Sequence, residues 1–218
     1  MERFFILDKF NTWYDWRSYL TAKDVTPPEP KTNYVELDGM SGTLDLSESL
    51  TGEITYKDRT VTATFWTCKG SYKDRERLLQ RIVTSLHGKK IKIVEPDDPD
   101  HYFYGRINIK SETNILPYAE FTIEAVCDPW RYAIYDSERS VVVRGSTADV
   151  VINNNGLKTL CPTITVSSGH VYITYDGVET SLTSGTYKLS NVKLRQGVNI
   201  IKVSGLGLVT FSYKEADI

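Results

Sequence analysis

The segment from Asp97 to His101 is the first place where side chains could bind a metal ion, because it holds three carboxylates and an imidazole. Divalent cations take oxygen ligands, and transition metals also take an imidazole nitrogen. The spacing is not that of an EF-hand loop, and Pro96 and Pro99 interrupt the segment. We therefore expect a solvated loop tip, with adventitious binding of a divalent cation as the alternative.

The cysteines and the other two histidines do not suggest a reaction centre. Cys68, Cys127 and Cys161 are widely spaced, contain no Cys-x-x-Cys pair and have no histidine close in sequence. This spacing favours free thiols in a reducing compartment. His87 and His170 have no nearby serine or cysteine in the setting of a nucleophile. His87 is expected at a helix C-terminus, where a protonated imidazole would interact favourably with the helix dipole.

Other arrangements that support catalysis are also missing from the sequence. Asp45, Glu48 and Glu53 could be grouped as glycosidase carboxylates, but nothing distinguishes them from many other acidic residues. The chain has no glycine-rich phosphate loop. We expect no catalytic residue, no cofactor and no metal site, and therefore a protein that is not an enzyme.

The bulk composition excludes two further classes of partner. The 218 residues are 40% hydrophobic and 25% charged, with a net charge of −2 and no basic stripe. We therefore expect neither specific nucleic-acid binding nor attraction to an anionic membrane. No apolar run could span a bilayer, and the N-terminus lacks the cleavage site of a signal peptide. The chain is expected to stay in the cytoplasm or to assemble there into something larger.

Residues 1–136 are predicted to form a mixed domain with one helix on a sheet. The helix begins after Ser71, whose side chain can cap it together with Asp74, and ends at Gly88. The opposite face is expected to point to solvent or to a partner and is rich in arginine; it consists of Lys73, Arg75, Glu76, Arg77 and Arg81. Strands are predicted at residues 4–7, 60–65, 91–94, 102–109 and 118–126, and one interpretation of residues 11–20 is a further strand with aromatic residues on both faces.

The segment from Asp38 to Arg59 organises this first domain. Glycines at positions 39, 42 and 52 set bends in it, and we expect it to form a corner of the domain. The preceding prolines, Pro27, Pro28 and Pro30, predict an extended connection. That connection is either a surface loop or an arm that lies against another subunit.

Residues 137–218 have a different pattern. Short runs of β-formers alternate with turns such as Asp176-Gly177, and no helical period appears. A small β-sandwich is therefore expected after a polar boundary at residues 136–139. Seven strands are predicted, at residues 141–143, 150–152, 164–166, 171–175, 187–189, 198–203 and 208–213. The whole chain is thus predicted to be mainly β, with domains at 1–136 and 137–218.

The sequence PPEPKTNYVELDGMSGTLDLSESLTG, followed by ITYKDRTVTATF, resembles the N-terminal domain of the distal tail protein (Dit) family of phages with long, non-contractile tails. Further counterparts are the helix at 72–86, Cys127-Asp128-Pro129-Trp130, and a C-terminal run from Gly197 to Tyr213. Relatives come from phages and prophages of Gram-positive bacteria. The resemblance covers nearly the whole chain, and its N-terminal motifs are the more specific part.

This resemblance implies a structural protein of the virion at the phage tail tip, made in the cytoplasm of the bacterial host. Such proteins form a six-membered ring between the tail tube protein and the tail fibre or tail-associated lysin. The N-terminal domain would form the ring, and a galectin-like C-terminal sandwich would face outward toward a receptor-binding protein or cell-wall glycan. A carbohydrate-binding module for host attachment is the alternative.

A ring made head to tail needs two different contact surfaces on each subunit. Interface centres are rich in aromatic residues and arginine. On this ground the candidate subunit interface consists of Trp13, Trp16, Arg59, Trp66 and Tyr72.

Overall fold

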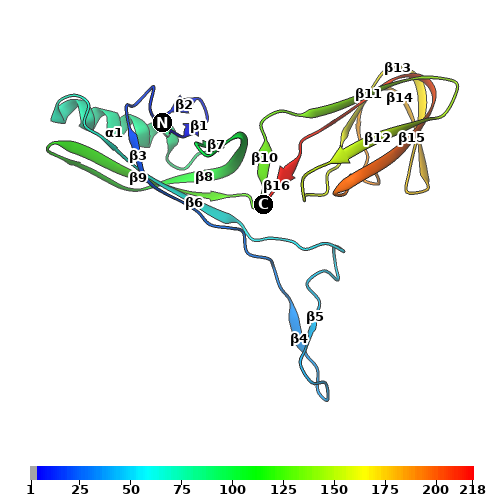
Figure 1. The fold of residues 1–218 in the computed structure, drawn as a ribbon, viewed down its shortest axis with the longest axis horizontal. Coiled ribbons are helices and arrows are strands. Elements are labelled where there is room, and N and C mark those ends of the chain that lie inside the picture. Colours follow the sequence, from blue (N-terminus) through cyan, green and yellow to red (C-terminus); the bar gives the residue numbers. More distant parts are fainter. Residues whose placement is uncertain (1–3) are drawn as a thin grey trace. The chain divides into compact units, whose positions relative to one another are not determined.

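The computed structural model describes residues 4–218, apart from the side chain of Ser111. It contains two compact units (Figure 1). The first unit extends to Arg131 and also includes Ile218, and the second runs from Tyr132 to Asp217. Each unit has its own hydrophobic core. The described residues are mainly strand with a single helix, which confirms the predicted fold class. No helix among the described residues has the length and the apolar composition that crossing a membrane requires.

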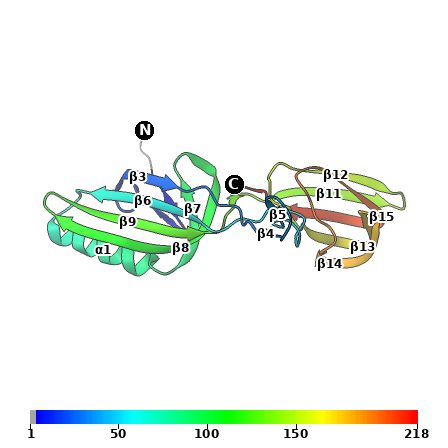
Figure 2. The ribbon, with the colours of Figure 1, turned by 90° about the horizontal axis from the view of Figure 1, so that it is seen from below.

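The first unit is built on an antiparallel sheet in the order β2-β1-β7-β8-β9-β6-β3 (Figure 2). Its strands are β1 (Ile6–Leu7), β2 (Phe10–Asn11), β3 (Tyr19–Val25), β6 (Arg59–Thr67), β7 (Lys90–Glu95), β8 (Asp98–Ile115) and β9 (Tyr118–Cys127). In β6 the buried Val61, Ala63 and Phe65 alternate with less buried residues, as the sequence predicts. Near the boundary, β10 (Arg131–Ala133) pairs with β16 (Ala216–Asp217).

Helix α1 (Tyr72–Leu86) has the predicted capping box. The Asp74 N–H donates to Ser71 Oγ at 3.3 Å, and the Ser71 N–H donates to the Asp74 carboxylate at 3.0 Å. Leu79, Ile82 and Leu86 join the same core as the inward residues of the strands. The prediction that Arg75 faces outward is wrong. It is buried, and its guanidinium donates to the side-chain oxygen of Asn114 at 3.2 Å and to a backbone carbonyl.

The strand predicted over residues 11–20 is also wrong, because its first half is a tight turn. The Asn11 side chain accepts hydrogen bonds from the N–H groups of Trp13 and Tyr14, each at 2.9 Å. The Asp15 carboxylate accepts from the Asn11 N–H at 2.7 Å. Asparagine and aspartate side chains that bond the local backbone compete with a sheet ladder. Only the end of the predicted strand belongs to β3, which starts at Tyr19.

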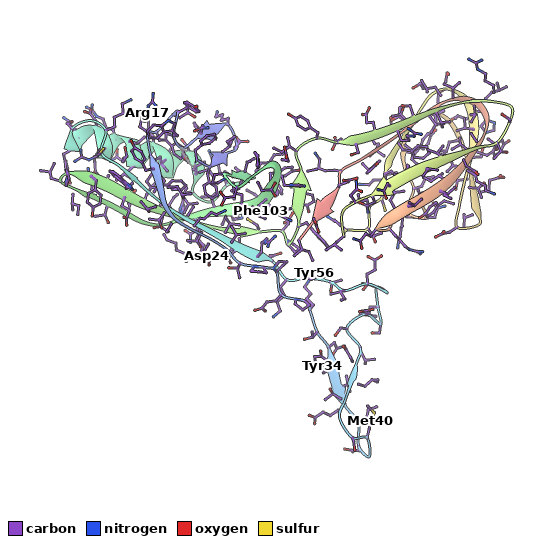
Figure 3. All side chains as sticks on the ribbon, in the orientation of Figure 1. Arg17, Asp24, Tyr34, Met40, Tyr56 and Phe103 are labelled. Atoms are coloured by element: carbon purple, nitrogen blue, oxygen red, sulfur yellow. The ribbon has the colours of Figure 1, made fainter. Side chains whose placement is uncertain are left out.

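Residues 26–58, which we call the arm, form a long exposed hairpin rather than a packed corner (Figure 3). Its two short strands, β4 (Tyr34–Glu36) and β5 (Thr43–Asp45), pair only with each other. The glycines do form bends, since Gly39, Gly42 and Gly52 all have positive φ. At the base of the arm an isolated bridge joins Pro30 and Tyr56. The arm therefore belongs to no hydrophobic core of the first unit.

The second unit contains fewer and longer strands than the seven predicted. They are β11 (Ser137–Arg144), β12 (Ala148–Asn154), β13 (Thr163–Tyr175), β14 (Val178–Lys188) and β15 (Gly197–Tyr213). Two predicted strands, at 164–166 and 171–175, are parts of the single bent strand β13, and those predicted at 198–203 and 208–213 are parts of the bent strand β15. The first part of β15 pairs with β12, and its last part pairs with β11. Buried residues of both parts share one core, so the long strands fold over to make the two layers of a sandwich.

The bend requires glycine where the strands cross from one layer to the other. Gly169 in β13 has φ +85°, and a Cβ added there would lie 1.9 Å from the Leu206 carbonyl oxygen. At Gly205 and Gly207 in β15 an added Cβ would lie within 2.4 Å of backbone oxygens of β13. The close approach of two backbones leaves no room for a side chain at these positions.

Candidate assembly surfaces

An aromatic row lies on the outer face of the first unit's sheet. It consists of Trp13, Tyr19, Trp66 and Tyr118, whose ring centroids are 4.7, 5.0 and 6.4 Å apart in that order. Register explains part of it, because Tyr19 in β3 is opposite Trp66 in β6. Trp66 alternates with the buried Phe65, so the row faces away from the core that α1 covers.

Arginine extends this row at one end. The guanidinium of Arg17 lies 5.3 Å from the centroid of the Trp13 ring, a cation–π contact. Tyr19 keeps 41% of its surface exposed. Exposed aromatic side chains beside arginine have the composition of an interface centre. The structure thus brings together two of the predicted interface residues, Trp13 and Trp66, and adds Tyr19 and Tyr118, which sequence reasoning missed.

Trp16 belongs to the core and not to this surface. Only 7% of it is exposed. Its ring centroid lies 5.6 Å from that of Phe10 and 6.2 Å from that of Phe121. A side chain enclosed in this way has no surface to offer a second subunit, so we remove Trp16 from the interface candidates.

Arg59 is likewise buried, with 5% of its surface exposed. Its Nε donates to the Thr26 carbonyl at 3.1 Å, its Nη1 donates to the Pro129 carbonyl at 3.4 Å, and its guanidinium lies 5.0 Å from the centre of the Phe103 ring. Burial lowers the pKa of this guanidinium, and the positive charge of Arg131 adds to the effect. Arg59 therefore ties the base of the arm to the sheet.

Tyr72, the fifth predicted interface residue, stands at the first turn of α1 and is 51% exposed. It lies on the helix side of the sheet, whereas the aromatic row lies on the other side. The five predicted residues therefore divide between the core and two separate surfaces.

The acidic segment Asp97–His101 forms a hairpin turn in which Asp97 and Asp100 are exposed, as expected of a solvated loop tip. Ion pairs also connect this turn to neighbouring strands. The Asp98 carboxylate accepts from His101 Nδ1 at 2.8 Å and from Arg131 Nη1 at 3.0 Å. Lys23 pairs with Glu95 and, at 2.7 Å, with Asp97. Burial lowers the Lys23 pKa, but the bonds to these carboxylates outweigh it and raise the pKa overall. No group of three His, Cys, Asp or Glu residues within the described part of the chain could hold a metal ion.

The two remaining histidines have structural partners. His87 Nδ1 accepts a hydrogen bond from the Ile109 N–H at 3.2 Å. In the second unit, His170 Nε2 lies 2.6 Å from Ser181 Oγ, and the His170 ring lies 4.9 Å from that of Tyr172. Tyr172 is 37% exposed, so these three side chains form a small polar and aromatic surface on the sandwich.

Comparison with known proteins finds similarity among solved structures. No family model and no curated protein matches the chain. Among solved structures, the crystal structure of SPP1 Dit (gp 19.1) matches with a TM-score of 0.70 and 15% sequence identity, over 99% of each chain. That protein is described as a paradigm of the hub adsorption apparatus in phages that infect Gram-positive bacteria. The expected resemblance to a distal tail protein is confirmed in the fold, since this chain has the fold of SPP1 Dit over nearly its full length.

Proposed function

We propose that the chain is a structural, non-enzymatic hub protein of a phage tail tip. One observation carries the proposal: the fold agrees with that of SPP1 Dit over 99% of both chains, so the agreement includes both units. A shared fold alone does not fix a function. The sequence motifs of residues 27–65, which resemble the same family independently of the fold, support the assignment.

In this proposal six copies form a ring that joins the tail tube protein to the tail fibre or tail-associated lysin. Residues 1–136 make the ring, and residues 137–218 are available to a receptor-binding protein. A closed ring requires two different surfaces that meet head to tail. The aromatic row and the exposed face of α1, which lie on opposite sides of one sheet, are suitable for these contacts. Trp13, Trp66 and Tyr72 remain our interface candidates.

Electron microscopy of virions tests this role directly. Antibodies against the chain are expected to label the tail tip, and particles made without the protein are expected to lack a finished tip and to fail to attach. Labelling of the head, or normal tails in its absence, would contradict the proposal. Light scattering of the purified chain then addresses the ring, because six copies of a 24.8 kDa chain are readily distinguished from one.

Carbohydrate binding by the second unit is the alternative function. It is favoured by the exposed surface of His170, Tyr172 and Ser181, because sugars stack on aromatic rings and bond to polar side chains. Selective binding of the full chain to a cell-wall glycan, lost in Tyr172→Ala, would support host attachment through this surface. Equal binding by the variant would exclude it.

A further inference from the structure

Strand β12 lies at an edge of the second unit. It pairs with β15 along its whole length, from Ala148 to Asn154, and with no other strand in the part of the chain that the structure describes. Figure 2 shows β12 at the margin of its unit. An edge strand presents a row of backbone N–H and C=O groups that can pair with a strand of another chain.

The composition of β12 leaves this edge unprotected. Edge strands of natural proteins are usually guarded by charged side chains, proline or a bulge. The other two edge strands of the unit follow this rule, since β11 contains one glutamate and two arginines, and β14 contains one glutamate and one lysine. The sequence of β12 is ADVVINN, in which Asp149 is the only charged residue. Its pairing with β15 also runs without a register shift.

The outer face of the sheet beside this edge is apolar. Val151 is 49% exposed and lies directly opposite Ile200 of β15, which is 54% exposed. Val198, the preceding outward residue of β15, is 70% exposed. On the inner side, Val150 and Ile152 belong to the core of the sandwich. A strand added to β12 would therefore gain apolar contacts on both faces of the sheet.

The sequence of β12 is complementary to a second copy of itself. When two such strands pair antiparallel about Val151, Val150 of each copy lies opposite Ile152 of the other, and Asp149 lies opposite Asn153. No like charges meet in this register. Within one copy Asp149 already lies opposite Lys202 of β15, so its charge is balanced locally.

One hydrogen bond already reaches the end of the strand. The Asn153 carbonyl accepts from Tyr213 Oη at 3.4 Å. This bond is long and therefore weak, so a backbone N–H of an added strand could replace it.

We propose that the second units of two copies pair edge to edge through β12, antiparallel about Val151. The two strands then belong to one continuous sheet, and the outward Val151, Val198 and Ile200 of both copies form one apolar strip. The contact is isologous, because the same strand serves both copies, and it joins copies two at a time. It uses none of the surfaces that we assign to the ring, so it goes beyond the proposed function and can fail independently of it.

Cysteine cross-linking of the full chain tests this contact. The exposed Cys68 and Cys161 are first replaced by serine. Val151→Cys then places one thiol at the centre of the proposed pair. Residues directly opposite in an antiparallel pair have Cβ atoms about 4.5–5.5 Å apart, so a short bismaleimide should link this variant into dimers. Because one cysteine joins only two chains, the dimers report this contact whether or not a ring forms.

Two further variants test the register. Asp149→Cys and Asn153→Cys should each link poorly alone, because the like positions of two copies are four residues out of register, roughly 13 Å along the strand. An equal mixture of the two should link well, because position 149 of one copy then lies opposite position 153 of the other. Adding Val151→Lys to both should lower the linked fraction at least about tenfold, because two lysines would face each other.

The matched control is Val198→Cys, which is outward and exposed but lies one strand back from the edge. In the proposed pair these cysteines are separated by three strand spacings of about 4.8 Å each, so they should stay unlinked. Circular dichroism should show that all variants fold. The proposal is overturned if Val151→Cys stays monomeric, if Val198→Cys links equally well, or if Val151→Lys changes nothing. Defective tails in Val151→Lys virions without any linked dimer would also overturn it, and would assign the edge to a strand of another tail protein.

Discussion

Replacing Trp16 by alanine should strongly lower the free energy of unfolding of the first unit, because the structure places this residue in the core. It exposes 7% of its surface. Burying an aromatic side chain removes roughly 150–250 Å² from water, worth about 4–6 kcal/mol at about 25 cal/mol per Å². Measured losses for such large-to-small changes are about 3–5 kcal/mol. We expect the unfolding free energy to fall by about 3–5 kcal/mol.

Tryptophan fluorescence is suited to this measurement, since all four tryptophans of the chain lie before residue 131 and report on the first unit alone. For a denaturant slope of about 4 kcal/mol per M, the midpoint in guanidinium chloride should fall by about 1 M. Trp13→Ala is the matched control. Its ring lies in the outer row, so its midpoint should change much less. Equal shifts for both variants, or no shift for Trp16→Ala, would refute the assignment of Trp16 to the core.

Two further predictions concern backbone crowding and thiol ionisation. Gly169→Ala should destabilise the second unit by more than about 2 kcal/mol. Gly177→Ala should cost only about 1 kcal/mol, because an added Cβ at position 177 would meet open space. Equal melting temperatures for the two variants would contradict this prediction. Exposed Cys68 and Cys161 should react with a thiol reagent in the native protein, and Cys127 only after unfolding. Burial raises the pKa of Cys127 from 9.0 to about 12. The thiol therefore ionises more readily in the unfolded chain, and the free energy of unfolding should fall as the pH rises between these two values, as urea titrations can show.

Local patterns in the sequence predict the elements that depend on local interactions. Ser71 and Asp74 cap α1 through side chains three residues apart, and the alternation in β6 follows directly from the pleat of a strand. The bends of β13 and β15 could not be predicted in the same way. A glycine between two apolar runs indicates either a turn between strands or a fold-over within one, and the difference depends on which distant strand approaches Gly169.

The candidate surfaces were less predictable, because the exposure of a side chain depends on contacts between residues that are far apart in the sequence. Trp13 and Trp16 are three residues apart in one turn, and composition gives no reason to place one outside and the other in the core. Tyr19 and Trp66 form a stacked pair only because β3 and β6 are neighbours with that register. A row assembled across strands has no periodic pattern along the chain.

The arm shows why the same residues can support two opposite interpretations. Glycine bends and alternating leucines between Asp38 and Arg59 are equally compatible with a packed corner and with an exposed hairpin. What distinguishes the hairpin is that its apolar side chains find no core, while Arg59 at its base is buried and bonded. A rigid base with an uncovered acidic and apolar end is the arrangement expected of a segment that is completed by a partner.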